Sequence, residues 1–264
     1  DGYKISNINI ESNNQYVGMF GYVNGGTIKN LTLENQTVKS TFITSASYVG
    51  GIAGYINGKT IENVSIVGTS SVENTSSTNG VYIGGIVGQS NNLNVINSNT
   101  NANVIANTTS SGYIYIGGII GNISGGKIEQ SYATGNITAT SENGAINAGG
   151  IVGTNQTTIT KSYASGNISA TTTGSGTICA GGLIGSTSGG RIEQCYSTGD
   201  VTTITDTGTI NSGGLIGNKN STTQMYVNNV YATGKIAARS NSGTVWAGGL
   251  MANAYYVNVT NAYA

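Results

Sequence analysis

Two kinds of residue in this chain have the type and spacing to do chemistry: a tyrosine that recurs once per repeat, and a pair of cysteines. The tyrosine column consists of Tyr132, Tyr163, Tyr196, Tyr231 and Tyr263. If these side chains face outward on strands stacked about 4.8 Å apart, they form an aromatic stripe. Such a stripe can stack on sugar rings or on a protein partner.

Packing is the alternative role for the tyrosine column. An early repeat reads Leu31-Thr32-Leu33, with large residues around a small centre, whereas a later one reads Ser131-Tyr132-Ala133. This exchange of large and small positions would conserve volume if the inward-facing residue changed between repeats. On this ground we favour buried or partly covered tyrosines over an exposed binding stripe.

The two cysteines, Cys179 and Cys195, are sixteen positions apart. A disulfide between them is allowed outside the cell. Two free thiols that act as small core residues are the other interpretation. The sequence leaves both alternatives open.

Most enzyme classes are excluded by the residues that the chain lacks. It has no histidine, which removes the imidazole base, the usual partner of nucleophilic serine or cysteine, and a frequent metal ligand. Of its three aspartates and two arginines, only Arg191, Asp200 and Asp206 fall close together in sequence. We therefore expect no enzymatic activity, no metal site and no cofactor.

The charge balance and hydropathy restrict the partners and the location. Ten Lys and Arg residues balance ten Asp and Glu residues, so the net charge is zero. Nucleic acid is excluded as a partner because phosphate binding needs a basic stripe. No apolar run approaches the roughly 18 residues of a membrane helix, so we expect no membrane insertion. The wealth of uncharged polar residues is typical of extracellular or cell-surface proteins.

A short motif organises the whole chain: glycine, then Ile, Leu or Met, any residue, and glycine or alanine. It recurs at intervals of 32 to 35 residues, and its copies begin at Gly18, Gly51, Gly85, Gly118, Gly150, Gly182, Gly214 and Gly249. Self-similarity at this period indicates a repeat architecture, so residues 1–264 are predicted to form a single repeat domain. Because the last copy stops where its sisters continue with Thr-Gly, we expect a fragment of a longer chain.

Each repeat contains three short extended segments, which in one copy are residues 178–185, 191–198 and 200–205. They are rich in β-branched residues and separated by glycines, which is typical of strands joined by turns. Such segments bury their apolar faces only by stacking on neighbouring repeats. The sequence therefore predicts an all-β fold, a right-handed parallel β-helix or β-solenoid of about eight coils of about 33 residues. Amides at one shared position predict a side-chain ladder: Asn30, Asn63, Asn97, Gln130, Gln194 and Asn229.

The unit that runs from Ala180-Gly181-Gly182-Leu183-Ile184-Gly185 to Val201 resembles the GLUG repeat. GLUG repeats are found in large bacterial cell-surface proteins, in adhesins and in the non-catalytic regions of some immunoglobulin A peptidases. The resemblance is most specific from Gly118 onward. It implies a surface scaffold rather than an active site.

We therefore expect an extracellular, non-catalytic cell-surface module, a stalk or adhesin scaffold, whose partners are surface glycans or host or cell-surface proteins. One alternative is a self-assembling extracellular filament or sheath subunit that associates head to tail through its end strands. The other alternative is glycan binding along the tyrosine column.

Overall fold

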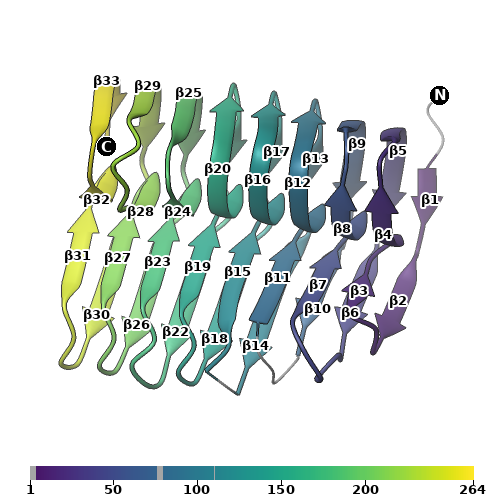
Figure 1. Cartoon of the computed structure of the whole chain (residues 1–264), viewed down its shortest axis with the longest axis horizontal. Helices are drawn as coiled ribbons and strands as arrows, with labels where there is room; N and C mark the ends of the chain where they lie inside the picture. Colours follow the sequence, from purple (N-terminus) through teal and green to yellow (C-terminus); the bar gives the residue numbers. More distant parts are fainter. Residues whose placement is uncertain (1–3, 76–79, 110) are drawn as a thin grey trace.

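The structure, a computed structural model, describes residues 4–75, 80–109 and 111–264. Within these ranges the chain forms parallel strands, turns and bends, and no helix that could cross a membrane is present there. The strands stack along one long axis, with the earliest and the latest strands of the chain at opposite ends of the rod (Figure 1).

Three parallel sheets, which we call A, B and C, contain 17, eight and eight strands. Sheet B consists of β2 (Asn9–Ser12), β6 (Thr37–Ser40), β10 (Ser71–Asn74), β14 (Asn103–Thr108), β18 (Ile137–Ser141), β22 (Ile168–Thr172), β26 (Val201–Thr205) and β30 (Ile236–Ser240). Sheet C consists of β3 (Tyr16–Val17), β7 (Ser47–Gly50), β11 (Gly80–Gly84), β15 (Tyr113–Gly117), β19 (Ile146–Gly149), β23 (Ile178–Gly181), β27 (Ile210–Gly213) and β31 (Val245–Gly248).

Sheet A is larger because most coils contribute two strands to it. Its members are β1 (Lys4–Ser6), β4 (Phe20–Asn24), β5 (Thr27–Glu34), β8 (Ala53–Asn57), β9 (Thr60–Val67), β12 (Val87–Ile96), β13 (Asn99–Thr100), β16 (Ile120–Glu129), β17 (Tyr132–Ala133), β20 (Val152–Thr160), β21 (Tyr163–Ala164), β24 (Ile184–Thr187), β25 (Gly190–Ser197), β28 (Ile216–Lys219), β29 (Met225–Ala232), β32 (Met251–Ala254) and β33 (Val257–Tyr263). Each full coil runs from sheet C through sheet A to sheet B.

Equivalent residues of successive coils lie side by side. Ile178 of β23 pairs with Ile146 of β19 and with Ile210 of β27, and its backbone N–H donates to the carbonyl oxygen of Thr209 at 2.9 Å. The eight stacked strands of sheet B are separated by seven turns of the coil. The predicted parallel β-solenoid is thereby confirmed, while its right-handed sense stays a prediction.

The prediction that residues 178–185 form one extended segment is wrong. The segment breaks after Gly181 into β23 of sheet C and β24 of sheet A. At this corner the carbonyl oxygen of Leu215 accepts two hydrogen bonds, from Leu183 N–H at 2.9 Å and Ile184 N–H at 3.0 Å. The glycine pair thus bends the chain while its backbone groups stay paired with the next coil.

Inward side chains form one continuous hydrophobic core along the rod. A column of fully buried aliphatic residues follows the glycine pair of successive coils: Ile52, Ile86, Ile119, Ile151, Leu183 and Leu215. Burying one methylene group stabilises a fold by about 0.8 kcal/mol. Because each coil is covered by its neighbours, this stabilisation depends on the stack and not on any single coil.

The predicted amide ladder is confirmed for one pair of its predicted members, because Asn63 Nδ2 donates to Asn30 Oδ1 at 3.1 Å. Asn261, which was not predicted, extends the column in the same way and donates through Nδ2 to Asn229 Oδ1 at 3.1 Å. These residues also share a left-handed backbone, with φ between 49° and 56°. Asparagine tolerates this conformation better than other residues with a side chain, so the column is selected by backbone geometry as well as by side-chain bonds.

Lys161 occupies the same column with φ 50°, which predicts that the protein can be stabilised at this position. Replacing it with asparagine should stabilise the protein by about 0.5–1 kcal/mol, because asparagine relieves part of the cost of a left-handed backbone. The free energy of unfolding in urea measures this effect. The control is Lys59→Asn, which removes the same charge from a residue whose φ is outside the left-handed region. Equal effects of the two substitutions would contradict the prediction.

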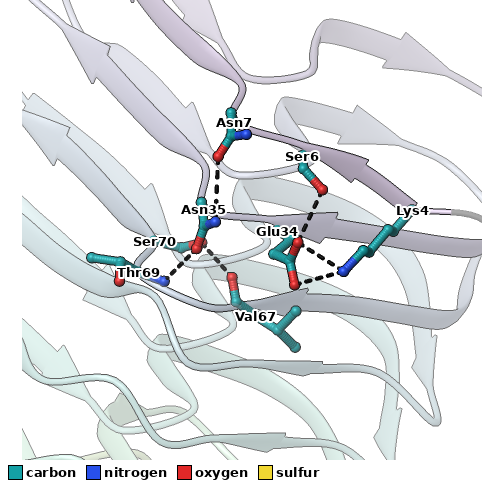
Figure 2. A network of polar contacts seen from close by, with 8 residues as sticks. All are labelled: Lys4, Ser6, Asn7, Glu34, Asn35, Val67, Thr69 and Ser70. Atoms are coloured by element: carbon teal, nitrogen blue, oxygen red, sulfur yellow. Dashed lines mark hydrogen bonds and ion pairs between the residues drawn. The ribbon is translucent and has the colours of Figure 1, made fainter.

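Asparagines also tie the turn between sheets A and B to neighbouring coils, as Figure 2 shows. Asn35 Nδ2 donates to Asn7 Oδ1 at 3.3 Å, and Asn35 Oδ1 accepts the backbone N–H of Thr69 at 3.0 Å. Beside them, the hydrogen bond from Lys4 holds the pKa of Glu34 below its usual value. Exposed ion pairs stabilise folds little. The amide hydrogen bonds therefore contribute more than this ion pair to holding neighbouring coils in register.

Candidate functional site

The structure brings all five predicted tyrosines together in one outward-facing column, which we call the tyrosine ladder. Adjacent rings lie face to face, with centroids 4.7 to 5.1 Å apart and interplanar angles of 2° to 7°. The members come from β17, β21, β25, β29 and β33 of sheet A. Stacked aromatic pairs contribute about 0.5–1.5 kcal/mol each beyond the area that they bury.

The idea that the inward-facing residue changes between repeats is wrong. Thr32 pairs with Ser65, Ser65 with Asn99, and Asn99 with Tyr132. The tyrosines therefore continue an outward column that earlier coils fill with smaller polar residues. The residues beside each tyrosine point inward in every coil, so another constraint must make them small.

Two contacts explain the small inward residues around each tyrosine. Ser131 Oγ accepts the backbone N–H of Ser98 at 3.1 Å and donates to the carbonyl oxygen of Glu129 at 2.8 Å. A Cβ added to Gly118 would lie 2.6 Å from the Cβ of Ala133. The Ser-Tyr-Ala triplet therefore consists of an inward hydrogen-bonding serine, an outward ring and an alanine packed against the glycine corner.

The stacking limits what the tyrosine ladder can bind. Both faces of each inner ring are covered by its neighbours, so only the ring edges and hydroxyl groups are open to a ligand. Tyr263 at the end of the ladder is 63% exposed. Burial, and then the neighbouring tyrosines, raise the pKa of Tyr163 and Tyr231 above its usual value. The ladder is thus a neutral row of hydroxyl groups, and sugar stacking on ring faces is restricted to its ends.

Cys179 and Cys195 are free and buried in this structure, so the disulfide alternative is wrong there and the free-thiol alternative holds. Cys179 lies in sheet C, where Asn211 Nδ2 approaches its sulfur at 3.7 Å, whereas Cys195 lies in sheet A and donates to the carbonyl oxygen of Glu193 at 3.2 Å. Burial raises the pKa of Cys179 to about 11 and that of Cys195 to about 12. Neither thiol is therefore activated as a nucleophile.

Cys195 occupies the position of the inward serine, which predicts how it can be replaced. Cys195→Ser should change the free energy of unfolding by less than about 0.5 kcal/mol, because serine reproduces the bonds of Ser131 and Ser162. Cys195→Ala should cost about 1–2 kcal/mol, because it leaves the N–H of Ser162 without its acceptor. The denaturant midpoints of the two variants test this prediction. Equal losses of stability in both variants would refute a hydrogen-bonding role for the Cys195 sulfur.

A second group of tyrosines was missed from the sequence. Tyr16, Tyr48, Tyr82 and Tyr115 form an outward column on sheet C, with adjacent centroids 4.8 to 5.1 Å apart. Tyr48 also meets Tyr55 of sheet A edge to face at 5.9 Å. The signal was present, because a tyrosine stands two or three residues before the first glycine of the motif in these coils.

Contact between outward residues of two sheets means that the corner between them is concave on the outside. We call this space the groove; it runs between sheet C and the first sheet A strand of each coil. Its sheet C wall is Tyr16, Tyr48, Tyr82, Tyr115, Asn147, Cys179, Asn211 and Trp246. Its sheet A wall is Tyr22, Tyr55, Gln89, Asn122, Thr154, Ser186, Asn218 and Asn253.

The groove changes character along the rod. Tyrosines fill its N-terminal half, whereas amides and hydroxyls line the other half, where Asn147 Nδ2 donates to Thr154 Oγ1 across the groove at 3.2 Å. At the C-terminal end it opens into a cavity of about 370 Å³, lined by Thr177, Thr209, Asn211, Asn218, Asn220, Thr244, Trp246 and Asn253. This end of the groove combines an aromatic ring with amide donors and acceptors.

The acidic residues near Arg191 have structural partners. Asp200 Oδ1 accepts the backbone N–H of Lys235 at 2.8 Å, Asp206 Oδ1 accepts from Asn241 Nδ2 at 2.8 Å, and Arg191 pairs with Glu193 at 2.7 Å. Asp200 thereby extends a ladder in which Asn136 and Asn167 accept backbone N–H groups of the following coils. Among the described residues, no group of three or more His, Cys, Asp or Glu side chains could hold a metal ion.

Comparison with known protein families matches the GLUG motif at residues 112–138, 144–169 and 176–202. No curated protein and no solved structure matches the chain. Each matched segment begins just before a sheet C strand, crosses the groove corner and sheet A, and ends at a sheet B strand, so one motif corresponds to one coil. Residues 112–202 are therefore a region of three consecutive GLUG repeats.

Proposed function

We propose that this chain is a non-catalytic structural and adhesive module of an extracellular cell-surface protein. The observation that carries the proposal is the unbroken pairing of neighbouring coils in all three sheets, over one continuous core. A rod built in this way resists bending because every coil is hydrogen-bonded to the next. Its role is to project or space an attached partner and to offer its surface for contact with surface glycans or with host or cell-surface proteins.

The polar residues support a scaffold role rather than catalysis. The aspartates and asparagines between sheets A and B hold backbone groups, the inward serines do the same, and both thiols are buried. The three GLUG repeats agree with a repeat structural module. The uncharged surface chemistry favours the extracellular location, as composition does.

A filament subunit is the second candidate, and exposed apolar side chains in the outermost coils favour it. They are Ile5, Phe20 and Tyr22 in the first coil, and Val245, Trp246, Tyr255, Tyr256, Val259 and Tyr263 in the last. Unpaired strand edges with apolar side chains are templates for pairing with another chain.

Negative-stain electron microscopy across a dilution series tests the proposal and separates the two candidates. Separate rods about 40 Å long at every concentration support the scaffold, on the length expected for eight strand spacings. Long unbranched fibres that persist at low concentration would make assembly the function instead. Compact particles of no fixed length would refute both.

A further inference from the structure

The C-terminal half of the groove is the one place in the described surface where an exposed tryptophan adjoins a row of amides. Trp246 of β31 is 46% exposed and faces the groove, in register with Asn211 of the preceding coil. Asn218 and Asn253 lie opposite on the sheet A wall, one coil apart. No charged side chain lines the cavity at this end.

The amides of this wall retain hydrogen-bonding capacity. Asn218 Oδ1 is buried from solvent and has no hydrogen-bond partner in the protein. A buried acceptor without a partner costs about 1–3 kcal/mol, which a donor would recover if the Asn218 side chain turned to meet it. Asn218 therefore lines the cavity with an amide oxygen that no protein group uses.

The two halves of the groove differ in whether their rings are available. In the N-terminal half, Tyr48 stacks on Tyr16 at 5.0 Å and on Tyr82 at 4.8 Å, so its faces are covered. Trp246 stands beside Asn211 and not beside another ring, and it is 46% exposed, so a ligand can reach the indole. A ligand would therefore bind the cavity that Asn211, Asn218, Asn253 and Trp246 line.

We propose that this cavity binds a straight, neutral chain of β-1,4-linked pyranose sugars. A pyranose presents an apolar C–H face that stacks on an aromatic ring and hydroxyls that pair with amides, which is the chemistry of this groove. One coil spacing, about 4.8 Å, is close to the advance of one sugar unit, so successive coils can contact successive sugars. A β-1,4 linkage keeps the chain straight, as the in-register walls require, whereas an α-1,4 linkage curls it.

This inference deepens the adhesive part of the proposed function by naming its ligand class. Its failure is distinguishable from failure of the scaffold proposal, because rod length is measured independently by electron microscopy. A rod that binds no sugar would leave the scaffold intact and remove only this site.

Trp246 is the only tryptophan in the chain, so its fluorescence reports on this site alone. We would titrate the 264-residue protein with the β-1,4-linked hexamers of glucose and of N-acetylglucosamine. The α-1,4-linked glucose hexamer and the charged galacturonate hexamer serve as ligand controls. We expect a saturable fluorescence change, with protection from acrylamide quenching, for at least one β-1,4 hexamer and for neither control.

Variants identify the contacts. Asn218→Ala and Asn253→Ala should raise Kd at least tenfold together, while Trp246 still reports. Trp246→Ala should abolish binding in calorimetry, and circular dichroism checks that it remains folded. The control Tyr226→Ala, at an aromatic residue that is 52% exposed outside the groove, should leave Kd unchanged.

Three outcomes would overturn the inference. The first is no response to either β-1,4 hexamer, and the second is equal response to the α-1,4 or charged hexamer. The third is binding that survives the asparagine and tryptophan variants but is lost in Tyr263→Ala, which would assign sugar binding to the end of the tyrosine ladder.

Discussion

Gly182→Ala is expected to destabilise the protein by about 3 kcal/mol or more, because an alanine Cβ cannot be accommodated without moving backbone. That atom would lie 2.1 Å from the carbonyl oxygen of Gly214 in the next coil and 2.6 Å from Ser197 Oγ. The φ of Gly182 is outside the left-handed region, so backbone strain does not contribute. The loss would arise from displacing the backbone of the next coil and the inward Ser197 of the same coil.

Gly249→Ala is the matched control, because Gly249 holds the same motif position in the last coil. There the added Cβ would meet only the Ala264 Cβ, at 3.0 Å. We expect a change within about 1 kcal/mol, since alanine also lowers the entropy of the unfolded chain. Urea unfolding measures both variants, and similar losses in the two would show that coil contact is not what excludes a side chain.

Alkaline pH is expected to unfold the protein, with stability constant up to about pH 8.5 and falling steeply above pH 9 to 10. Burial is the first cause that raises the pKa of Tyr48, Tyr55, Tyr82 and Tyr115, and neighbouring tyrosines add to it in each case. The two thiols are raised as well, to about 11 and 12.

The sign follows from proton linkage. Above the unfolded pKa, near 9 for the thiols and 10 for tyrosine, these groups ionise in the unfolded chain but stay protonated in the folded one. Each such group lowers stability by up to about 1.4 kcal/mol per pH unit until its folded pKa is passed. Lys219 has the opposite effect on stability as the pH rises, because burial lowers its pKa. It is a single group, whereas several tyrosines and two thiols lower stability. Partial exposure of the tyrosines reduces the effect, and we expect a loss of several kcal/mol by pH 11.

The measurement is the urea midpoint as a function of pH, followed together with tyrosinate absorbance. Replacing Tyr48, Tyr82 and Tyr115 with phenylalanine should move the alkaline decline to higher pH, because the rings still stack but cannot ionise. Tyr226→Phe, outside the groove, is the control. A flat profile to pH 11, or a decline that the triple variant leaves unchanged, would contradict the role of these tyrosines.

The groove and the tyrosine ladder give the same rod two surfaces of different chemistry. Ladder rings cover one another and leave a row of hydroxyl groups. The groove ends in an exposed indole next to amides. If adhesion is the function, the two variants Trp246→Ala and Tyr263→Ala therefore separate the surfaces without touching the core.

The sequence alone determined the coil. Glycine spacing gave the repeat, β-branched segments between glycines gave the strands, and stacking followed because such short segments cannot bury their faces alone. The asparagine column was also predictable, although its left-handed backbone at Asn30 and Asn63 was not. Residues 112–202 could be identified as GLUG repeats for the same reason, since the motif is local in sequence.

The tertiary structure decided which way side chains face and which of them meet. A shift of one residue moves a strand's side chains to the opposite face, and the triplet around Tyr132 is too short to fix that choice. Only the packing of Ala133 on Gly118 and the bonds of Ser131 turn the ring outward. The groove likewise exists only because the glycine corner folds sheet C toward sheet A, which brings Asn147 to Thr154.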